Sequence, residues 1–111
     1  MTAQDERRSF PRYPFIAHAE VRDAGESSRL SARVSDISLS GCYLDMMNPL
    51  PVNTRIRVII HDNKNPFEAQ ARIVYSVPNL GAGVAFLDLE PSSKSSLEAC
   101  IESAIQDATL R

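Results

Sequence analysis

Hydrophobic and polar residues alternate along most of the chain between residues 15 and 90, which is typical of strands with one buried face. The longest alternation runs from Phe67 to Tyr75, where every second side chain is apolar or aromatic. Six segments of this kind predict strands at residues 15–23, 29–36, 41–46, 55–62, 67–77 and 81–89. Turn-forming glycine, proline, serine and asparagine residues separate the segments. The pattern therefore predicts an all-β domain.

The period of the pattern changes after residue 90. Apolar residues then recur at the three- and four-residue spacing of an amphipathic helix, at Leu97, Ile101, Ala104 or Ile105, and Ala108. Pro91 suits the first turn of a helix, and the two serines after it can cap free N–H groups. We expect a small six-stranded antiparallel barrel with a C-terminal helix that plugs or flanks one end. In this organisation residues 1–14 form a flexible arginine-bearing arm, 15–90 the barrel and 91–111 the helix.

Composition and charge narrow the class of protein. The chain of 111 residues is 43% hydrophobic and 23% charged, which fits one globular domain and excludes a disordered chain. No apolar run approaches the roughly 20 residues of a membrane-spanning helix, and the N-terminus is polar without a secretory signal. The expected location is therefore the cytoplasm, with no membrane partner. A net charge of −2 argues against general binding of duplex DNA, so no nucleic-acid partner is expected.

Two clusters of polar residues are not explained by packing, and the first is Arg7, Arg8 and Arg12 in the arm. Pro11 prevents a single regular helix here, so the three arginines crowd a short irregular segment. Their mutual repulsion is relieved when an anion binds among them, and arginine grips phosphate or a guanine edge with two parallel hydrogen bonds. The alternative is a solvated terminus, partly neutralised by the two acidic residues before the cluster.

The second cluster is Asp36, Ser38 and Gly41 in the segment D-I-S-L-S-G. A carboxylate and a hydroxyl two residues apart in an extended segment point the same way, so they can face one ligand. Gly41 permits the close approach of a backbone or a ligand, or supplies a positive φ angle. The alternative is an ordinary loop in which Asp36 and Ser38 accept hydrogen bonds from nearby backbone N–H groups.

Together with a third segment, the two clusters resemble the motifs of the PilZ domain family. The sequence has R-S-F-P-R at 8–12, D-I-S-L-S-G at 36–41 and G-A-G-V at 81–84, in the order of the family motifs RxxxR, DxSxxG and GxGV. The resemblance covers nearly the whole chain. It implies a six-stranded barrel with a C-terminal helix, acting as a receptor for cyclic di-GMP and not as an enzyme. Cyclic di-GMP is a bacterial second messenger with two guanines and two phosphodiesters.

The resemblance also implies roles for individual residues. Arg8 and Arg12 are expected to contact phosphates and guanine edges. Asp36 and Ser38 are expected to hold a guanine or a phosphate from the barrel surface, and Gly41 to leave room for close approach. The third segment is interpreted as architectural, with glycines at a bend and Val84 in the core.

Arg7 extends the first motif to R-R-S-F-P-R, and in this family such an arginine accompanies the binding of two stacked ligand molecules per chain. No cofactor and no metal are implied besides the ligand. With no second domain visible in the sequence, we expect a stand-alone receptor that signals to an unidentified protein effector through ordering of the arm. Relatives regulate motility, pili, exopolysaccharide synthesis or chemotaxis, and nothing in the sequence selects among these.

Other functions were weighed against the receptor. His18 and Glu20 share a strand face but lack further metal ligands, and Cys42 and Cys100 have no histidine partner for nucleophilic catalysis. An OB-like binder of single strands needs exposed aromatic rings along a basic groove, whereas this chain has seven aromatic residues and no tryptophan. Tyr75 is expected to pack in the core, although a ring near the site could stack on guanine. The principal alternative is a PilZ-like protein-interaction module that binds no ligand, and such a module would be indifferent to mutation of the arginines.

Overall fold

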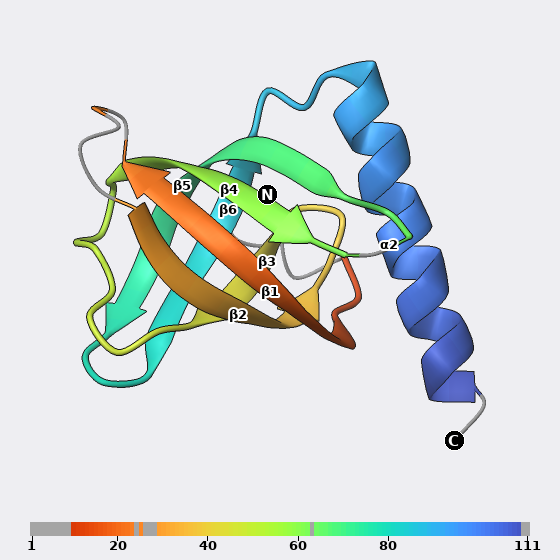
Figure 1. The fold of residues 1–111 in the computed structure, drawn as a ribbon, viewed down its shortest axis with the longest axis horizontal. Coiled ribbons are helices and arrows are strands. Elements are labelled where there is room, and N and C mark those ends of the chain that lie inside the picture. The colour runs from red at the N-terminus through yellow and green to blue at the C-terminus, as the bar shows by residue number, and fades with distance from the viewer. Residues whose placement is uncertain (1–9, 24, 26–28, 63, 110–111) are drawn as a thin grey trace.

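The structure, a computed structural model, describes residues 10–23, 25, 29–62 and 64–109 and contains six strands followed by one helix (Figure 1). The elements are β1 Tyr13–Asp23, β2 Arg29–Ile37, β3 Gly41–Asp45, β4 Arg55–His61, β5 Phe67–Val77, β6 Gly81–Leu87 and α2 Pro91–Thr109. Each predicted strand agrees with the observed one to within two residues at either end. The prediction of an all-β domain with one C-terminal helix is confirmed.

The six strands form a closed barrel in the order β1-β2-β3-β6-β5-β4, and every neighbouring pair is antiparallel. Pairing of β1 with β4 closes the barrel, so the sheet has no free edge strand. Helix α2 packs against β1 and β5 and lies beside one end of the barrel (Figure 1). It therefore flanks the barrel, and this leaves the outer faces of β2, β3 and β6 uncovered by the helix. No helix among the described residues is long and apolar enough to cross a membrane.

The core consists of the inward-facing side chains of all six strands and one stripe of α2. Alternate positions of the strands are fully buried, as the hydrophobic pattern predicts; examples are Val34, Leu44, Ile60 and Ile73. The helix contributes Leu97, Cys100, Ile101 and Ala104. Ile105 remains 40% exposed, so the helical stripe passes through Ala104 rather than through its neighbour.

The start of α2 at Pro91 is as predicted, but Ser93, the second of the two serines after it, does not have the predicted capping contact. The hydroxyl of Ser93 donates a hydrogen bond to the carbonyl oxygen of Glu68 in β5, at 3.1 Å. The backbone N–H of Lys94 donates to the carbonyl of Glu90, at 2.8 Å. The side chain of Ser93 therefore ties the helix to the barrel wall and does not cap a backbone N–H group.

The alternation of inner and outer residues breaks once in β5. Ile73 pairs with Val84 of β6, whereas Tyr75 pairs with Gly83, so Val74 is an extra residue that forms a β-bulge. The bulge turns Tyr75 to the outer face, where the residue is 42% exposed. The prediction that Tyr75 packs in the core is therefore wrong. Alternation within one strand cannot reveal an extra residue relative to the partner strand.

Candidate functional site

Asp36 reaches the outer face of the barrel through a second β-bulge, near the end of β2. Val34 pairs with Leu44 of β3, but Asp36 pairs with Tyr43, which leaves Ser35 as the extra residue. Val34 remains fully buried, whereas the Asp36 side chain is 33% exposed. The bulge therefore places a carboxylate on the surface at a position that simple alternation would turn into the core.

Arg12 lies directly beside this carboxylate. Tyr13 pairs with Ile37 and Pro14 with Asp36 at the start of β1, so the residue before the strand is held next to the end of β2. Nη1 of Arg12 donates a hydrogen bond to Oδ1 of Asp36 at 3.2 Å, and this ion pair is partly exposed. The structure thus brings together one residue from each of the first two motifs, 24 positions apart in the sequence. The predicted residues Arg7 and Arg8 lie outside the described part of the chain.

Ser38 is buried, with an exposed fraction of only 1%, and its hydroxyl organises the β2–β3 turn. The backbone N–H groups of Ser40 and Gly41 both donate to Oγ of Ser38, at 3.2 Å each. The N–H of Ser38 in turn donates to the carbonyl of Gly41, at 2.9 Å. The Ser38 hydroxyl therefore accepts hydrogen bonds from nearby backbone N–H groups, as in the ordinary loop that was the alternative to ligand binding. A direct contact of Ser38 with a ligand stays a prediction.

Gly41 is required by the packing of two backbones. A Cβ at this position would lie 2.0 Å from the carbonyl oxygen of Val84 in β6. No described glycine has a positive φ angle, so Gly41 serves the close approach of a neighbouring strand and not a left-handed conformation.

The two outward-facing glycines of β6 are crowded by different neighbours. A Cβ on Gly83 would lie 2.2 Å from a ring carbon of Tyr75, whereas one on Gly81 would lie 2.1 Å from the backbone carbonyl oxygen of Leu44 and 2.9 Å from the hydroxyl oxygen of Tyr43. The centroids of the two rings are 6.1 Å apart, and their planes are tilted by 35°. The G-A-G-V segment was expected to place glycines at a bend, and this is corrected here. Both glycines lie within strand β6; Gly83 makes room for the Tyr75 ring and Gly81 for the backbone of Leu44, while Val84 is buried as expected.

Four of these residues form one row across neighbouring strands. Asp36 pairs with Tyr43, Tyr43 with Gly83, and Gly83 with Tyr75. With Arg12 at its end, the row places a cation, a carboxylate and two aromatic rings on one outer face of β2, β3, β6 and β5. We call these five residues the motif face. Sequence analysis did not single out Tyr43, although the alternation in G-C-Y-L-D already turns its side chain outward.

The electrostatics of the motif face favour the neutral form of the Tyr43 phenol. Burial raises the pKa of Tyr43, and the nearby Tyr75, Asp45 and Asp36 raise it further. Arg33 donates from Nε and Nη2 to Oδ2 of Asp45, at 3.0 and 2.8 Å, so this second ion pair adjoins the first on the β2–β3 surface. A protonated phenol can donate a hydrogen bond and presents an uncharged ring for stacking.

The other side chains considered for chemistry lie apart from the motif face or in the core. Cys42 and Cys100 are both buried; burial raises the pKa of the Cys42 thiol well above its usual value and that of Cys100 to about 11. His18 and His61 face each other on β1 and β4 with ring centroids 5.6 Å apart. Within the described residues no three histidine, cysteine or acidic side chains are grouped to hold a metal ion.

A cavity of about 510 Å³ lies between the outer face of β4 and β5, the end of β6 and the start of α2. Its lining includes Arg57, Glu68, Leu87 and Ser93 but no residue of the motif face. The motif face lies outside this cavity, on the outer surface of the barrel wall.

Comparison with known proteins identifies the family. The chain matches the PilZ domain over residues 6–103 and belongs to the PilZ domain family, as its motifs predict. No curated protein matches the chain.

Solved structures share the fold at low sequence identity. The chain superposes on Escherichia coli YcgR in complex with cyclic di-GMP with a TM-score of 0.78 and 20% identity, covering 93% of this chain and 48% of that one. The PilZ domain of Escherichia coli YcgR with cyclic di-GMP superposes with a TM-score of 0.75 and 18% identity, covering 92% of this chain and 94% of that one. The PilZ domain of CeSA from a cellulose-synthesizing bacterium superposes with a TM-score of 0.66 and 20% identity, covering 86% of this chain and 96% of that one. The chain thus spans about half the length of the YcgR chain, and these likenesses show a common fold.

Proposed function

We propose that this protein is a receptor for cyclic di-GMP and that the ligand binds across the motif face. The observation that carries the proposal is the contact between Arg12 and Asp36, since it joins one residue of each ligand-binding motif on one outer surface. Membership of the PilZ family and the two YcgR structures with cyclic di-GMP support the choice of ligand.

The groups on the motif face complement the chemistry of this ligand. A guanine presents N1–H and N2–H₂ donors, for which the carboxylate of Asp36 is a suitable acceptor. Its O6 and N7 atoms and the phosphodiesters accept from a guanidinium such as that of Arg12. The exposed ring of Tyr75 offers a flat apolar surface on which a base can stack, at a gain of about 1–3 kcal/mol.

Binding exchanges a weak interaction for stronger ones. The side chains of Arg12 and Asp36 are 45% and 33% exposed, and an ion pair so accessible to water contributes at most about 1 kcal/mol. Hydrogen bonds from charged groups to a desolvated ligand contribute about 1.5–3 kcal/mol each. When a ligand inserts between the two side chains, its new hydrogen bonds therefore contribute more free energy than is lost by separating Arg12 from Asp36.

The remaining motif residues have distinct parts in the proposal. Arg7 and Arg8 supply further contacts to the dianionic ligand, and Arg7 favours two stacked molecules per chain. Ser38 and Gly41 act by shaping the turn beside Asp36. The bound arm then alters the surface offered to a protein effector, so the output is a change in protein–protein interaction and not catalysis. A cytoplasmic location and the absence of a cofactor stay predictions.

Titration calorimetry with cyclic di-GMP tests the proposal. The wild type is expected to bind with micromolar or tighter affinity, and Arg12→Ala and Asp36→Ala should each weaken binding by about tenfold or more, because each removes a charged partner. The matched controls are Arg57→Ala and Glu68→Ala, which break an ion pair of similar exposure far from the motif face. They should bind like the wild type. A folded wild type that gives no binding heat contradicts the proposal and favours an interaction module that binds no ligand.

A further inference from the structure

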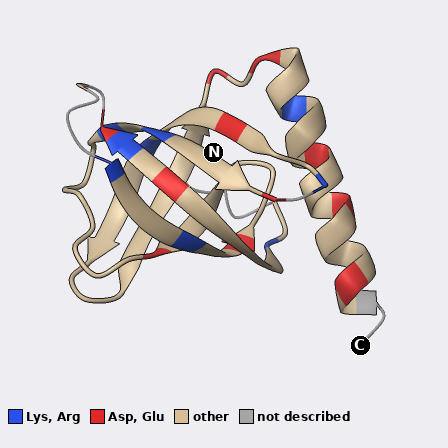
Figure 2. Cartoon of the chain, viewed as in Figure 1, with Lys and Arg blue, Asp and Glu red and all other residues tan. Residues whose placement is uncertain are grey.

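Six described arginines lie on the outer faces of β1, β2, β4 and β5. Arg33 of β2 is paired with Asp45 beside the motif face. The other five are Arg29 in β2, Arg22 in β1, Arg55 and Arg57 in β4, and Arg72 in β5; we call these five the arginine face. Figure 2 shows most of the basic segments of these strands gathered at the end of the barrel that lies away from α2, with one further basic segment midway along β2, whereas α2 carries several acidic residues. The molecule as a whole has a net charge of −2, so this concentration of positive charge is local.

The pairing of the strands sets these arginines directly opposite one another. Arg22 pairs with Arg29 on one side and with Arg57 on the other, and Arg55 pairs with Arg72. Like charges directly opposite in an antiparallel pair are destabilising. The sheet therefore keeps three unfavourable pairs on one surface.

Carboxylates compensate only part of this charge. Oε2 of Glu20 lies 2.5 Å from Nε of Arg22 and 3.9 Å from Nε of Arg29, and Glu68 pairs with Arg57 at 2.8 Å. For Arg55 and Arg72 the described residues provide no such ion pair.

The Nη1 of Arg72 donates instead to the neutral side-chain oxygen of Asn53, at 2.9 Å. Arg55 and Arg72 thus form a pair of opposed cations whose electrostatic repulsion an external anion would relieve.

An apolar surface adjoins the arginines. Met47 and Val52 in the β3–β4 loop and Leu80 in the β5–β6 turn are 70%, 49% and 63% exposed. Backbone hydrogen bonds fix these segments: the N–H of Asn79 donates to Met47 at 2.8 Å, and that of Asn53 to Ile73 of β5, also at 2.8 Å. Asn53, next to Val52, also accepts the bond from Arg72, so the loop and the arginine face are directly connected.

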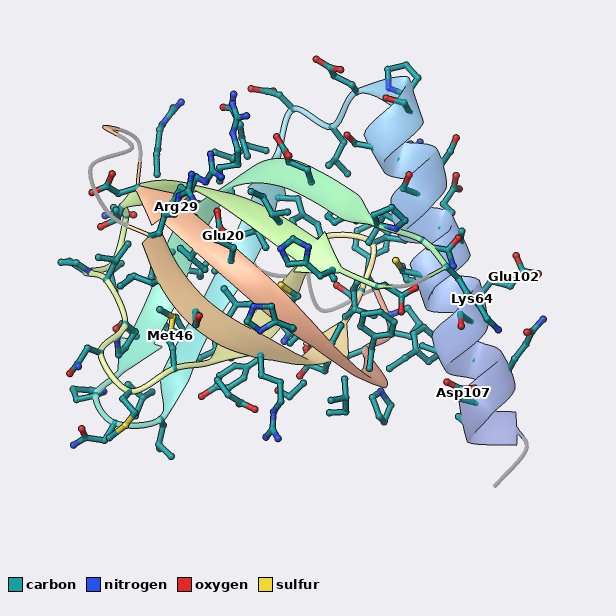
Figure 3. All side chains as sticks on the ribbon, in the orientation of Figure 1. Glu20, Arg29, Met46, Lys64, Glu102 and Asp107 are labelled. Atoms are coloured by element: carbon teal, nitrogen blue, oxygen red, sulfur yellow. The ribbon has the colours of Figure 1, made fainter. Side chains whose placement is uncertain are left out.

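Figure 3 places Arg29 and Met46, the neighbour of Met47, at this end of the barrel and Lys64, Glu102 and Asp107 at the other. Methionine and arginine are both enriched in protein interfaces, and a preorganised apolar surface loses little entropy on binding.

We propose that the arginine face and the adjoining apolar loops form a docking surface for an acidic helix of a partner protein. The closed barrel has no edge strand to pair with, so a partner must bind through side chains. Carboxylates at positions i and i+4 of a helix are about 6 Å apart along its axis, close to the roughly 6.8 Å between Arg55 and Arg57 along β4. Each carboxylate can accept two parallel hydrogen bonds from a guanidinium.

A protein partner fits this surface better than a nucleic acid does. Glu20 and Glu68 lie within the arginine face and repel a continuous run of phosphates, and the net negative charge of the chain opposes a long polyanion. A short acidic helix contacts only the local positive charge and also offers apolar side chains to Met47 and Leu80. The proposal does not depend on binding of cyclic di-GMP.

Fluorescence anisotropy with defined probes tests this proposal. The first probe is a labelled helical peptide with glutamate at i and i+4 and leucine beside them, the second replaces each glutamate by glutamine, and the third is a short DNA duplex. The variant Arg55→Glu/Arg72→Glu is compared with Lys64→Glu/Lys94→Glu, which makes the same change in net charge at the other end of the molecule. Circular dichroism checks that both variants fold, and calorimetry with cyclic di-GMP is run separately.

The wild type is expected to bind the glutamate peptide in about 0.15 M salt and to bind the glutamine peptide at least about tenfold more weakly. Arg55→Glu/Arg72→Glu should lose about tenfold or more, and the lysine variant less than about threefold. Equal losses in the two variants, no binding by the wild type, or tighter binding of the DNA duplex would each overturn the proposal. None of the probes is cyclic di-GMP, so a failure here does not affect the result of the separate titration with cyclic di-GMP.

Discussion

The ring of Tyr75 occupies the space on the outer face of β6 that a side chain at position 83 would need. A Cβ on Gly83 would lie 2.2 Å from a carbon of this ring. Gly41 is crowded in a different way, because its neighbour at 2.0 Å is the carbonyl oxygen of Val84. A side chain can rotate away from a new methyl group, whereas the backbone of a central strand cannot. The two glycines therefore differ in how much an added methyl group destabilises the fold.

We expect Gly83→Ala to lower the free energy of unfolding by about 1–3 kcal/mol, as overpacking commonly does, and Gly41→Ala to lower it by more. Gly25→Ala is the control, since a Cβ there meets nothing closer than 3.8 Å. Urea unfolding measures all three variants. Truncation of the ring in Tyr75→Ala should relieve part of the cost of Gly83→Ala. If the two changes are additive to within about 0.5 kcal/mol, the ring does not occupy this space.

Residue orientation marks the limit of what the sequence could predict. The alternation of apolar and polar residues correctly placed Val34, Ile60 and Ile73 in the core. It failed for Tyr75 because a bulge depends on the pairing with β6, which one strand alone does not encode. The same kind of bulge turns Asp36 outward in β2. Motif spacing selected Asp36 as a site residue, but only the paired strands explain why its carboxylate reaches the surface.

At the scale of elements, the β2–β3 turn fixes the position of Asp36 relative to β3. The turn contains only residues 38–40, and the buried hydroxyl of Ser38 accepts hydrogen bonds from the backbone N–H of Ser40 and from that of Gly41, the first residue of β3. The sequence predicts a loop here and is compatible with Ser38 binding either a ligand or the local backbone. The structure shows that Ser38 bonds to the backbone. Predicting this would require knowing that the Ser38 side chain is buried, and a short polar segment does not reveal burial.

Replacement of Ser38 by alanine is expected to lower the free energy of unfolding by about 1–3 kcal/mol, because two backbone donors then lose their acceptor in a buried turn. The exposed Ser31 of β2, which pairs with β1, is the matched control, and Ser31→Ala should change the stability by less than about 0.5 kcal/mol. Chemical denaturation measures both. An equally small effect of the two substitutions would mean that the Ser38 hydroxyl does not hold the turn.

In the molecule as a whole, strand pairing in the closed barrel brings together residues that lie far apart in the sequence, and no local sequence pattern predicts these contacts. Arg12 meets Asp36 across the β1–β2 pair, and Arg55 meets Arg72 across the β4–β5 pair. The first contact joins two motifs that the sequence showed only as separate segments. The second contact, between Arg55 and Arg72, could not be predicted from the sequence, because two like charges are known to lie opposite each other only when the pairing of their strands is known.

Amide chemical-shift mapping with cyclic di-GMP shows whether the ligand binds across the motif face. We expect the largest shifts in an isotope-labelled sample at Asp36, Tyr43, Tyr75 and Gly83, while the amides of Glu98 and Glu102 on the outer face of α2 barely shift. Largest shifts at Arg57, Glu68 and Ser93 would place the ligand in the cavity beside the helix and contradict binding across the motif face. An unchanged spectrum at saturating ligand would contradict it as well.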